Sequence, residues 1–186
     1  MKKALKIAIP IVLVAVVLGI YPCFVLVGRH SNKKLGIVYD KAFLHQTSAQ
    51  VETFDAELHE TIDRLHVVLK RSSGIGLAAP QIGVLQRVVL IKDGSATIEA
   101  VNPEIIHMSN RKNSFESCLS ISWRVKTVKR YSRITIRAQD RNGAYFEKTL
   151  SGMGAFVASH EIDHLDGILF TDAQAGTHRA YLAPAS

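Results

Sequence analysis

The chain has 186 residues, of which 47% are hydrophobic, 7% aromatic and 21% charged, and its formal net charge is +7. These proportions are those of an ordinary globular protein, so they exclude a disordered polypeptide and a collagen-like repeat. The two cysteines, Cys23 and Cys118, lie far apart in different kinds of sequence, which argues against a disulfide framework.

The first feature along the chain is an apolar segment. A basic N-terminus, residues 1–6, precedes residues 7–28, a run of 22 positions without a charged side chain. A helix of roughly 20 apolar residues can cross a bilayer. The run is longer than the apolar core of a signal peptide, and Tyr21-Pro22-Cys23-Phe24 at its end offers no small-residue cleavage site. We therefore expect a single-pass transmembrane helix at residues 7–28.

Residues 29–34 are expected to form a linker, and the first predicted element of the domain that follows is a helix. Apolar residues recur there at steps of three and four, as on one face of an amphipathic helix. These residues are Val51, Phe54, Leu58, Ile62, Leu65 and Leu69. Thr47 and Gln50 resemble a capping box, and Ser72-Ser73-Gly74 is expected to end the helix.

Beyond Gly83 the pattern changes to short runs rich in β-branched residues, which predict strands. The runs cover residues 87–92, 97–101, 124–128, 134–138 and 145–150, and Asn142-Gly143 predicts a hairpin turn. A last helix is expected from near Ser151 to Gly167, before a polar tail at residues 173–186. A helix, then several strands, then a helix indicates an α+β fold rather than a doubly wound parallel sheet.

The last helix carries the strongest chemical pattern. His160-Glu161-Ile162-Asp163-His164 places two imidazoles one helical turn apart, where both can bind one metal ion, and Glu161 is placed to act as a general base. The alternative is a chance match on a polar helix face. His59-Glu60-Thr61-Ile62-Asp63 nearly repeats the pattern, but Asp63 replaces the second imidazole and Ile62 faces the core, so we interpret that segment as a solvated face.

A catalytic metal site of this type needs a third protein ligand and an open position for water. Cys118 is the candidate, in Phe115-Glu116-Ser117-Cys118-Leu119-Ser120. Taken alone, a single thiol in a domain without a disulfide partner is more often a small buried hydrophobic residue.

A third cluster, Gly74-Ile75-Gly76-Leu77-Ala78-Ala79-Pro80-Gln81, superficially fits the G-x-G-x-x-G/A dinucleotide fingerprint. That motif must follow a strand and open a helix, whereas here a helix precedes it and a strand follows, so a dinucleotide site is not expected. The two glycines instead allow a substrate to approach the backbone closely, and Gln81 offers an uncharged side-chain donor.

Together the three clusters resemble the peptide deformylase family, whose motifs are GxGxAAxQ, EGCLS and HExDH in that order. Residues 74–81 and 160–164 fit fully, and residues 116–120 fit except for Ser117, where the family usually has glycine. The resemblance covers roughly residues 35–172. It implies a domain of antiparallel strands around a C-terminal metal-binding helix.

The resemblance also implies roles for individual residues. It makes Cys118, His160 and His164 the metal ligands and Glu161 the general acid and base. Gln81 and the backbone N–H of Leu119 become the groups that stabilise the oxyanion. The implied substrate-binding residues are Gly74, Ile75, Gly76, Ser117, Met153, Phe156 and Val157, of which the last three line a methionine pocket.

The implied activity is removal of the formyl group from N-formylmethionyl peptides of newly made proteins, with release of formate. Two imidazoles and one thiolate suggest zinc on ligand chemistry alone. The resemblance implies ferrous iron, which zinc, nickel or cobalt can replace. Ser117 and Trp123 depart from the family pattern, and we expect them to alter substrate preference rather than to abolish activity.

Two other functions fit parts of the pattern. HExxH also marks membrane-anchored zinc endopeptidases, which need a further Glu or His ligand downstream, and the chain offers only His178 in its tail. An inactive peptide-binding homologue would keep the fold without the chemistry. Metal analysis distinguishes the inactive homologue from the two enzymes. A formate-release assay, compared with an assay of internal peptide cleavage, distinguishes the deformylase from the endopeptidase.

The expected partners beyond the substrate are a membrane and a nucleic acid. Residues 111–148 hold ten basic and three acidic side chains, which fits either a contact with ribosomal RNA or a solvated strand face. The charges on either side of residues 7–28 are nearly balanced, with a slight lean toward an external domain. Formylated nascent chains and an easily oxidised iron–thiolate site favour the cytoplasm, where we expect the catalytic domain.

Overall fold

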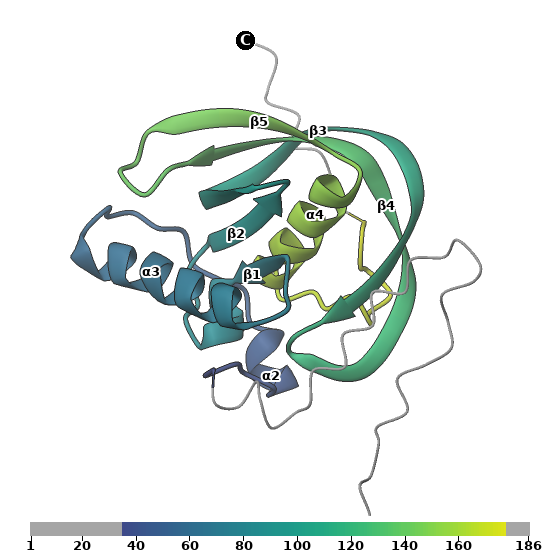
Figure 1. Ribbon diagram of the computed structural model, residues 1–186, viewed down its shortest axis with the longest axis horizontal. Coiled ribbons are helices and arrows are strands. Elements are labelled where there is room, and N and C mark those ends of the chain that lie inside the picture. The colour runs from purple at the N-terminus through teal and green to yellow at the C-terminus, as the bar shows by residue number, and fades with distance from the viewer. Residues whose placement is uncertain (1–34, 178–186) are drawn as a thin grey trace, which may run out of the picture.

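The computed structural model describes residues 35–177, in which a curved antiparallel sheet surrounds one helix (Figure 1). In chain order the elements are α2 (Lys41–Leu44), α3 (Ala56–Arg71), β1 (Gly76–Ala78), the 3₁₀ helix η1 (Ala79–Ile82), β2 (Val88–Asp93), β3 (Ala96–Cys118), β4 (Ile121–Gln139), β5 (Tyr145–Ser151) and α4 (Met153–Leu165). The predicted α+β class, with antiparallel strands and a C-terminal helix, is confirmed.

The part of the chain that the structure describes contains no helix long and apolar enough to cross a membrane. The transmembrane helix predicted at residues 7–28, the linker at residues 29–34 and His178 lie outside the described residues.

The five strands follow one another across the sheet in the order β1-β2-β3-β4-β5, and every neighbouring pair is antiparallel. β3 and β4 pair from Val101↔Gln139 to Cys118↔Ile121, so they form one long hairpin. Three register shifts interrupt this pairing, and bulges of this kind let a strand bend. The hairpin accordingly curves around α4 in Figure 1.

β2 shows how two cores are built on opposite faces of the sheet. Successive side chains of a strand point to opposite faces. Val89 and Ile91 belong to the core between the sheet and α4, whereas Val88 and Leu90 belong to the core beneath α3. All four side chains are fully buried, so the strand appears in the sequence as a continuous apolar run.

The predicted first helix is real, but its start was misplaced. Asp55 is the N-cap of α3, and its carboxylate accepts hydrogen bonds from the backbone N–H groups of Glu57 and Leu58. Thr47 and Gln50 precede the helix by several residues, so they do not form its capping box. The apolar spacing predicted too early a start for the helix, because Val51 and Phe54 pack against the same core as α3 without being helical.

The predicted strands at residues 97–101, 124–128 and 134–138 are parts of longer elements. The first is the start of β3, which continues to Cys118, and the other two are one strand, β4. The segment that joins the latter two keeps its ladder partners on β3, from Lys129 to Arg133, so pairing rather than apolar content defines it as a strand. The hairpin turn at Asn142-Gly143 is confirmed, with Gly143 in the left-handed region at φ 88°.

The domain continues past Asp172, where the resemblance to the family was expected to end. Ala175 is buried in a third cluster with Leu44 and Ile121, and the backbone N–H of Gly176 donates to Asp163 at 3.2 Å. The beginning of the predicted polar tail is therefore packed against α4.

Candidate active site

Two parts of the fold bring the predicted metal ligands together. His160 and His164 lie one turn apart on α4, and Cys118 is the last residue of β3, before the tight turn into β4. The ligand atoms of the three residues all lie within 4.8 Å of one another, and Cys118 Sγ is 3.2 Å from His164 Nε2. Among the described residues this is the single group of three or more metal-ligating side chains with that geometry.

A hydrogen bond fixes the orientation of His160. Its Nδ1 lies 3.0 Å from Glu116 Oε2. A carboxylate can only accept, so Nδ1 carries a proton and Nε2 is the ring atom left to bind a metal. Carboxylates that orient a ligating imidazole in this way also make it a better ligand.

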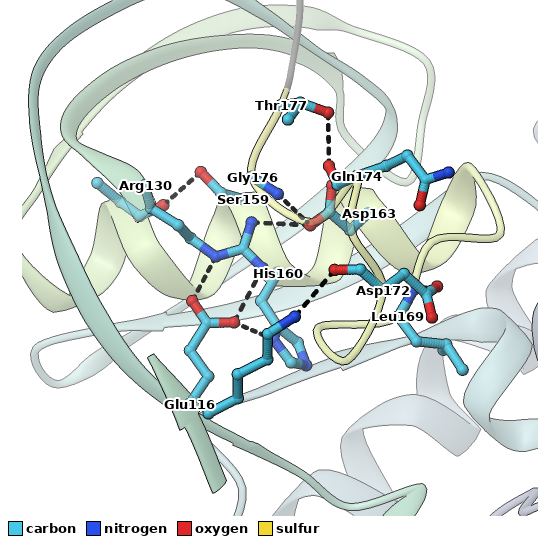
Figure 2. Close-up of polar contacts among 12 residues, drawn as sticks. Glu116, Arg130, Ser159, His160, Asp163, Leu169, Asp172, Gln174, Gly176 and Thr177 are labelled. Carbon is cyan, nitrogen blue, oxygen red and sulfur yellow. Dashed lines mark hydrogen bonds and ion pairs between the residues drawn. The ribbon is translucent and has the colours of Figure 1, made fainter. Parts of the chain in front are cut away.

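Glu116 belongs to a buried charge cluster around Arg130 (Figure 2). The fully buried guanidinium of Arg130 forms a bidentate ion pair with Glu116, through Nε and through Nη2, the latter at 2.9 Å. Its Nη1 donates to Asp163 Oδ2 at 2.8 Å. Burial alone would raise the pKa of Glu116, but hydrogen bonds from His160 and Arg130 outweigh burial and lower this pKa to about 2. The cluster therefore holds a carboxylate behind His160.

Glu161 is buried beside the proposed ligands, and its environment differs from that of Glu116. Burial raises the pKa of Glu161 to about 7, although the positive charges of His160 and Arg130 oppose the shift. Among the described residues, Oε2 of Glu161 has no hydrogen-bond partner. A buried carboxylate with a free oxygen and a pKa near neutrality is suited to accept and return a proton.

The imidazole pKa values are also shifted. Burial, aided by the nearby charges of His160 and Arg130, lowers the pKa of His164 well below its usual range, so His164 is neutral, as a ligand must be. Burial would also lower the pKa of His160, but its hydrogen bonds with Cys118 and Glu116 raise that pKa well above the usual range. Cys118 therefore interacts with both imidazoles, since its Sγ also lies 3.2 Å from His164 Nε2.

Gly76 explains why β1 can pass so close to α4. A Cβ built on Gly76 would clash with the Glu161 carboxylate and would lie 2.6 Å from Val157 Cγ1. Glycine is therefore required at this point of the strand for steric reasons. Gly76, Val157 and Glu161 therefore lie in contact where β1 passes α4.

The two proposed oxyanion donors flank Cys118. Gln81 Oε1 accepts from the backbone N–H of Ala78 at 2.8 Å, which turns Nε2 toward Cys118 Sγ, 3.5 Å away, and Ser120 Oγ, 3.4 Å away. Leu119 lies in the turn after Cys118, and a Cβ built on Gly74 would lie 2.8 Å from its Cδ1. The glycine-rich segment and the cysteine turn are therefore in direct contact.

The remaining predicted substrate residues lie toward the surface. Val157 is buried and Phe156 is half-buried, whereas Ile75, Ser117 and Met153 are exposed. Met153 and Phe156 occupy the first turn of α4, with Val157 one residue further, and His160 follows one turn after Phe156. The structure thus places Val157 against Gly76 and leaves the side chains of Ile75 and Met153 exposed.

Sequence reasoning missed the charge cluster that supports the site. Glu116 was quoted as part of a motif without a role, and Arg130 was counted among the basic residues of a solvated face, but it is fully buried. The near-match at residues 59–63 is the solvated face that was predicted, since Glu60 and Asp63 are exposed whereas Ile62 is buried in the core. No local pattern in the sequence distinguishes Arg130 from its neighbours.

The residues present fit a bound divalent metal. One thiol and two imidazoles converge, His160 presents Nε2 because Nδ1 is engaged, and a carboxylate with an unpaired buried oxygen stands beside them. Thiolate and imidazole ligands suit zinc and other first-row transition metals rather than magnesium or calcium. The arrangement can activate water next to a polarised carbonyl group.

Comparison with known proteins agrees with this geometry. A family model described as polypeptide deformylase matches residues 35–180. A peptide deformylase of Caldicellulosiruptor bescii is 42% identical over 134 residues, covering 72% of this chain and 81% of that protein. The crystal structure of a peptide deformylase from Legionella pneumophila has a TM-score of 0.69 and 40% identity, covering 72% of this chain and 82% of that one.

A third comparison concerns a peptide complex. The Met-Ala-Ser-bound crystal structure of a class I type b peptide deformylase from Acinetobacter baumannii has a TM-score of 0.69 and 26% identity. It covers 72% of this chain and 95% of that one.

Proposed function

This chain belongs to the peptide deformylase family, and on that basis we propose a role for each residue of its site. The enzyme is a hydrolase that removes the formyl group from N-formylmethionyl peptides of newly made proteins and releases formate. One observation carries the assignment of the site: the ligand atoms of Cys118, His160 and His164 lie within 4.8 Å of one another, beside the buried Glu161.

Cys118, His160 and His164 hold a divalent metal ion in this proposal. When bound, such an ion lowers the pKa of a water from about 15.7 to about 7, so that a nucleophile is available at neutral pH. Ferrous iron is the metal we propose, with zinc, nickel or cobalt as substitutes. The family resemblance supports iron, whereas ligand chemistry alone equally allows zinc.

Glu161 acts as the proton carrier. It accepts a proton as the nucleophile attacks the formyl carbon, and it returns that proton to the amine that leaves. The pKa of about 7 that burial gives to Glu161 supports this role, because acid–base catalysis is most efficient when the pKa lies near the working pH.

Gln81 Nε2 and the backbone N–H of Leu119 are proposed to donate to the carbonyl oxygen as negative charge develops there. The bond from Ala78 N–H to Gln81 Oε1 supports this role, because it holds the amide with its N–H₂ group toward Cys118. One such donor, correctly placed, contributes about 3 kcal/mol to the stabilisation of the transition state.

The methionine side chain is proposed to lie among Met153, Phe156, Val157 and Ile75, with the peptide backbone along Gly74, Gly76 and Ser117. The contact between Gly76 and Val157 supports this placement. The Met-Ala-Ser peptide bound by the related Acinetobacter baumannii enzyme makes formyl-Met-Ala-Ser a suitable test substrate.

The test of this function is anaerobic purification with ferrous iron, followed by metal analysis and formate release from formyl-Met-Ala-Ser. Stoichiometric metal with formate release, and no cleavage of an internal peptide bond, is the expected result. Cleavage of an unformylated internal peptide would favour the zinc endopeptidase alternative. Absence of both metal and turnover would favour an inactive peptide-binding homologue.

We also propose that residues 7–28 anchor the enzyme in a membrane with its domain in the cytoplasm. The uncharged run supports the anchor. The cytoplasmic location of formylated nascent chains supports the orientation, as does the sensitivity of an iron–thiolate site to oxidation. Reporters fused after Ser186 test this, one active only in the cytoplasm and one only in the periplasm. A strong periplasmic signal from the intact fusion would contradict the orientation.

Ribosome contact through basic residues 111–148 is supported by charge alone. Several of the basic side chains there are already engaged. Arg130 is buried, and Lys126 Nζ donates to the carbonyl oxygens of Thr171 and Asp172. Arg137 pairs with Glu147, and Arg141 pairs with Asp63 and Glu99. Sedimentation of the full chain with ribosomes at two salt concentrations tests this contact.

A further inference from the structure

Three large apolar side chains are exposed near the end of the β3–β4 hairpin. Phe115 is 80% exposed, Trp123 is 74% exposed and Val125 is 59% exposed. Single apolar residues are common on protein surfaces, whereas a group of them on one element marks an interaction site. We refer to this group as the hairpin patch.

The strand register shows that the hairpin patch is an outward surface and not a loosely packed part of the core. Phe115 pairs with Thr127, and Val125, two residues before Thr127 on β4, lies on the same face. Trp123 lies in the irregular stretch between the pairs Glu116↔Lys126 and Cys118↔Ile121, and its side chain is exposed. The opposite face carries Glu116 and Arg130, which are buried against α4. Folding therefore buries one face of the hairpin and leaves the hairpin patch on the other.

The surroundings of the hairpin patch are positively charged. Arg111 and Lys129 are exposed on the same face as Phe115 and Val125, and Arg124 is exposed between Trp123 and Val125. Lys112 and Lys126 alternate to the other face, where Lys126 bonds to the carbonyl oxygens of Thr171 and Asp172. Glu116 is the only acidic residue among residues 111–130, and its carboxylate is buried and paired with Arg130. The surface therefore combines apolar side chains with a positive charge that no neighbouring carboxylate on the hairpin offsets.

Trp123 is also held in an unusual backbone conformation. Its φ is +64°, in the left-handed region that bulky side chains rarely adopt. Such a conformation costs free energy and persists where the surrounding structure requires it, often at a functional site. Here it accompanies an indole that is turned toward solvent.

The hairpin patch lies near the point where the chain enters the domain. Leu35 packs against the core beneath α3, and three residues later Val38 packs in one cluster with Leu44 and Ile121, at the end of the hairpin. Figure 1 shows α2 beside that end. The uncharged run ends at residue 28, seven residues before Leu35. Seven extended residues span at most about 25 Å, so a bilayer that holds residues 7–28 is close to this side of the domain.

We propose that the hairpin patch docks on an anionic lipid surface, with Phe115, Trp123 and Val125 in the headgroup region and the basic side chains on the lipid phosphates. Aromatic side chains prefer this interfacial depth, and lysine and arginine near the surface are attracted to acidic lipids. The contact orients the domain on the membrane. It rests on the anchoring proposed for residues 7–28 and not on the assignment of the catalytic residues.

A lipid surface fits the hairpin patch better than RNA does. Binding to single-stranded RNA relies on aromatic rings on which bases stack. Val125 offers no ring, so the exposed apolar side chains of the hairpin patch are aliphatic as well as aromatic. Interfacial insertion uses aliphatic and aromatic side chains alike.

The chain contains one tryptophan, so its fluorescence reports on Trp123 alone. The experiment reconstitutes the full chain into vesicles of phosphatidylcholine, with or without phosphatidylglycerol, and adds brominated acyl chains as quenchers. The expected result is a shift of the emission to shorter wavelength and quenching at least about twofold stronger with the anionic lipid. Formate release from soluble formyl-Met-Ala-Ser, measured on the same samples, reports deformylase activity separately.

Arg124→Glu combined with Lys129→Glu should abolish the dependence on anionic lipid and leave formate release unchanged. The matched control, Lys70→Glu combined with Lys148→Glu, makes the same charge change at exposed lysines outside the hairpin and should retain the dependence. Equal emission and quenching in the two vesicle types would overturn the proposal. So would failure of the protein to float with vesicles, or a shift of Trp123 emission by RNA but not by lipid.

Discussion

Glu116→Gln is expected to lower the free energy of unfolding of the metal-free protein by about 3 kcal/mol. Glutamine keeps the volume of the side chain but removes the charge that faces Arg130, which then retains Asp163 as its remaining ionic partner in the cluster. The carboxylate has a pKa of about 2 in place of 4.5, since the hydrogen bonds and charges of His160 and Arg130 outweigh burial. Each pKa unit corresponds to about 1.4 kcal/mol.

A second argument gives a similar magnitude. Removal of one partner from a buried ion pair costs about 3–5 kcal/mol, because the other charge stays buried without compensation. The guanidinium of Arg130 is fully buried, so water cannot replace the lost carboxylate unless the hairpin moves away from α4.

Urea unfolding of the chelator-treated full chain in detergent, followed by circular dichroism, measures the loss. Glu147→Gln is the matched control, because Glu147 pairs with Arg137 at 3.0 Å on the surface, where the two side chains are 52% and 45% exposed. An exposed pair of this kind contributes less than about 1 kcal/mol. If Glu116→Gln is no more destabilising than the control, the charge of Glu116 does not hold Arg130 in place and the reasoning fails.

Glu161→Gln should retain the metal but lose about two to four orders of magnitude in formate release, since it removes the base and no ligand; near-normal turnover would rule out the role of Glu161. Cys118→Ser should weaken metal retention, because a soft thiolate becomes a hydroxyl, and unchanged metal content on elemental analysis would remove Cys118 from the site. Gly76→Ala should lower kcat with the metal retained, because the added methyl group displaces Glu161; steady-state kinetics beside metal analysis checks this. Burial would raise the pKa of Glu99, but the hydrogen bonds and charges of Arg141 and His66 outweigh burial and lower this pKa below 4.5. The carboxylate of Glu99 therefore stabilises the fold fully above pH 4.5, and this stabilisation is lost as the pH falls through the lowered pKa. The destabilisation by Glu99→Gln in urea unfolding should therefore be smaller at about pH 3 than at about pH 7, and an equal effect would contradict this.

The parts of the fold that could be predicted are those encoded locally. His160 and His164 are one turn apart on a helix, so their spacing alone predicts that they share a face. β2 and β5 are short runs of β-branched and aromatic residues, and both were expected within a residue of their observed ends.

The parts that were missed depend on partners far along the chain. Much of β3 beyond Val101 is polar and exposed, and its pairing with β4 rather than apolar content holds it as a strand. Arg130 lies 14 residues after Glu116 and 33 residues before Asp163, so no local spacing reveals their contact. The resemblance to the family predicted that Cys118 joins the histidines, which composition and periodicity alone did not indicate.

The buried position of Arg130 also has a consequence for the order in which the chain folds. Its partner Glu116 lies earlier in the chain, but Asp163 and the Gly176 backbone that bonds to Asp163 come much later. During synthesis the β3–β4 hairpin can pair as soon as both strands exist, yet its inner face must stay hydrated until α4 and residues up to 176 are available. Contacts of such long sequence separation slow folding. We therefore expect the sheet to close around α4 as a late, cooperative step that needs nearly the whole domain.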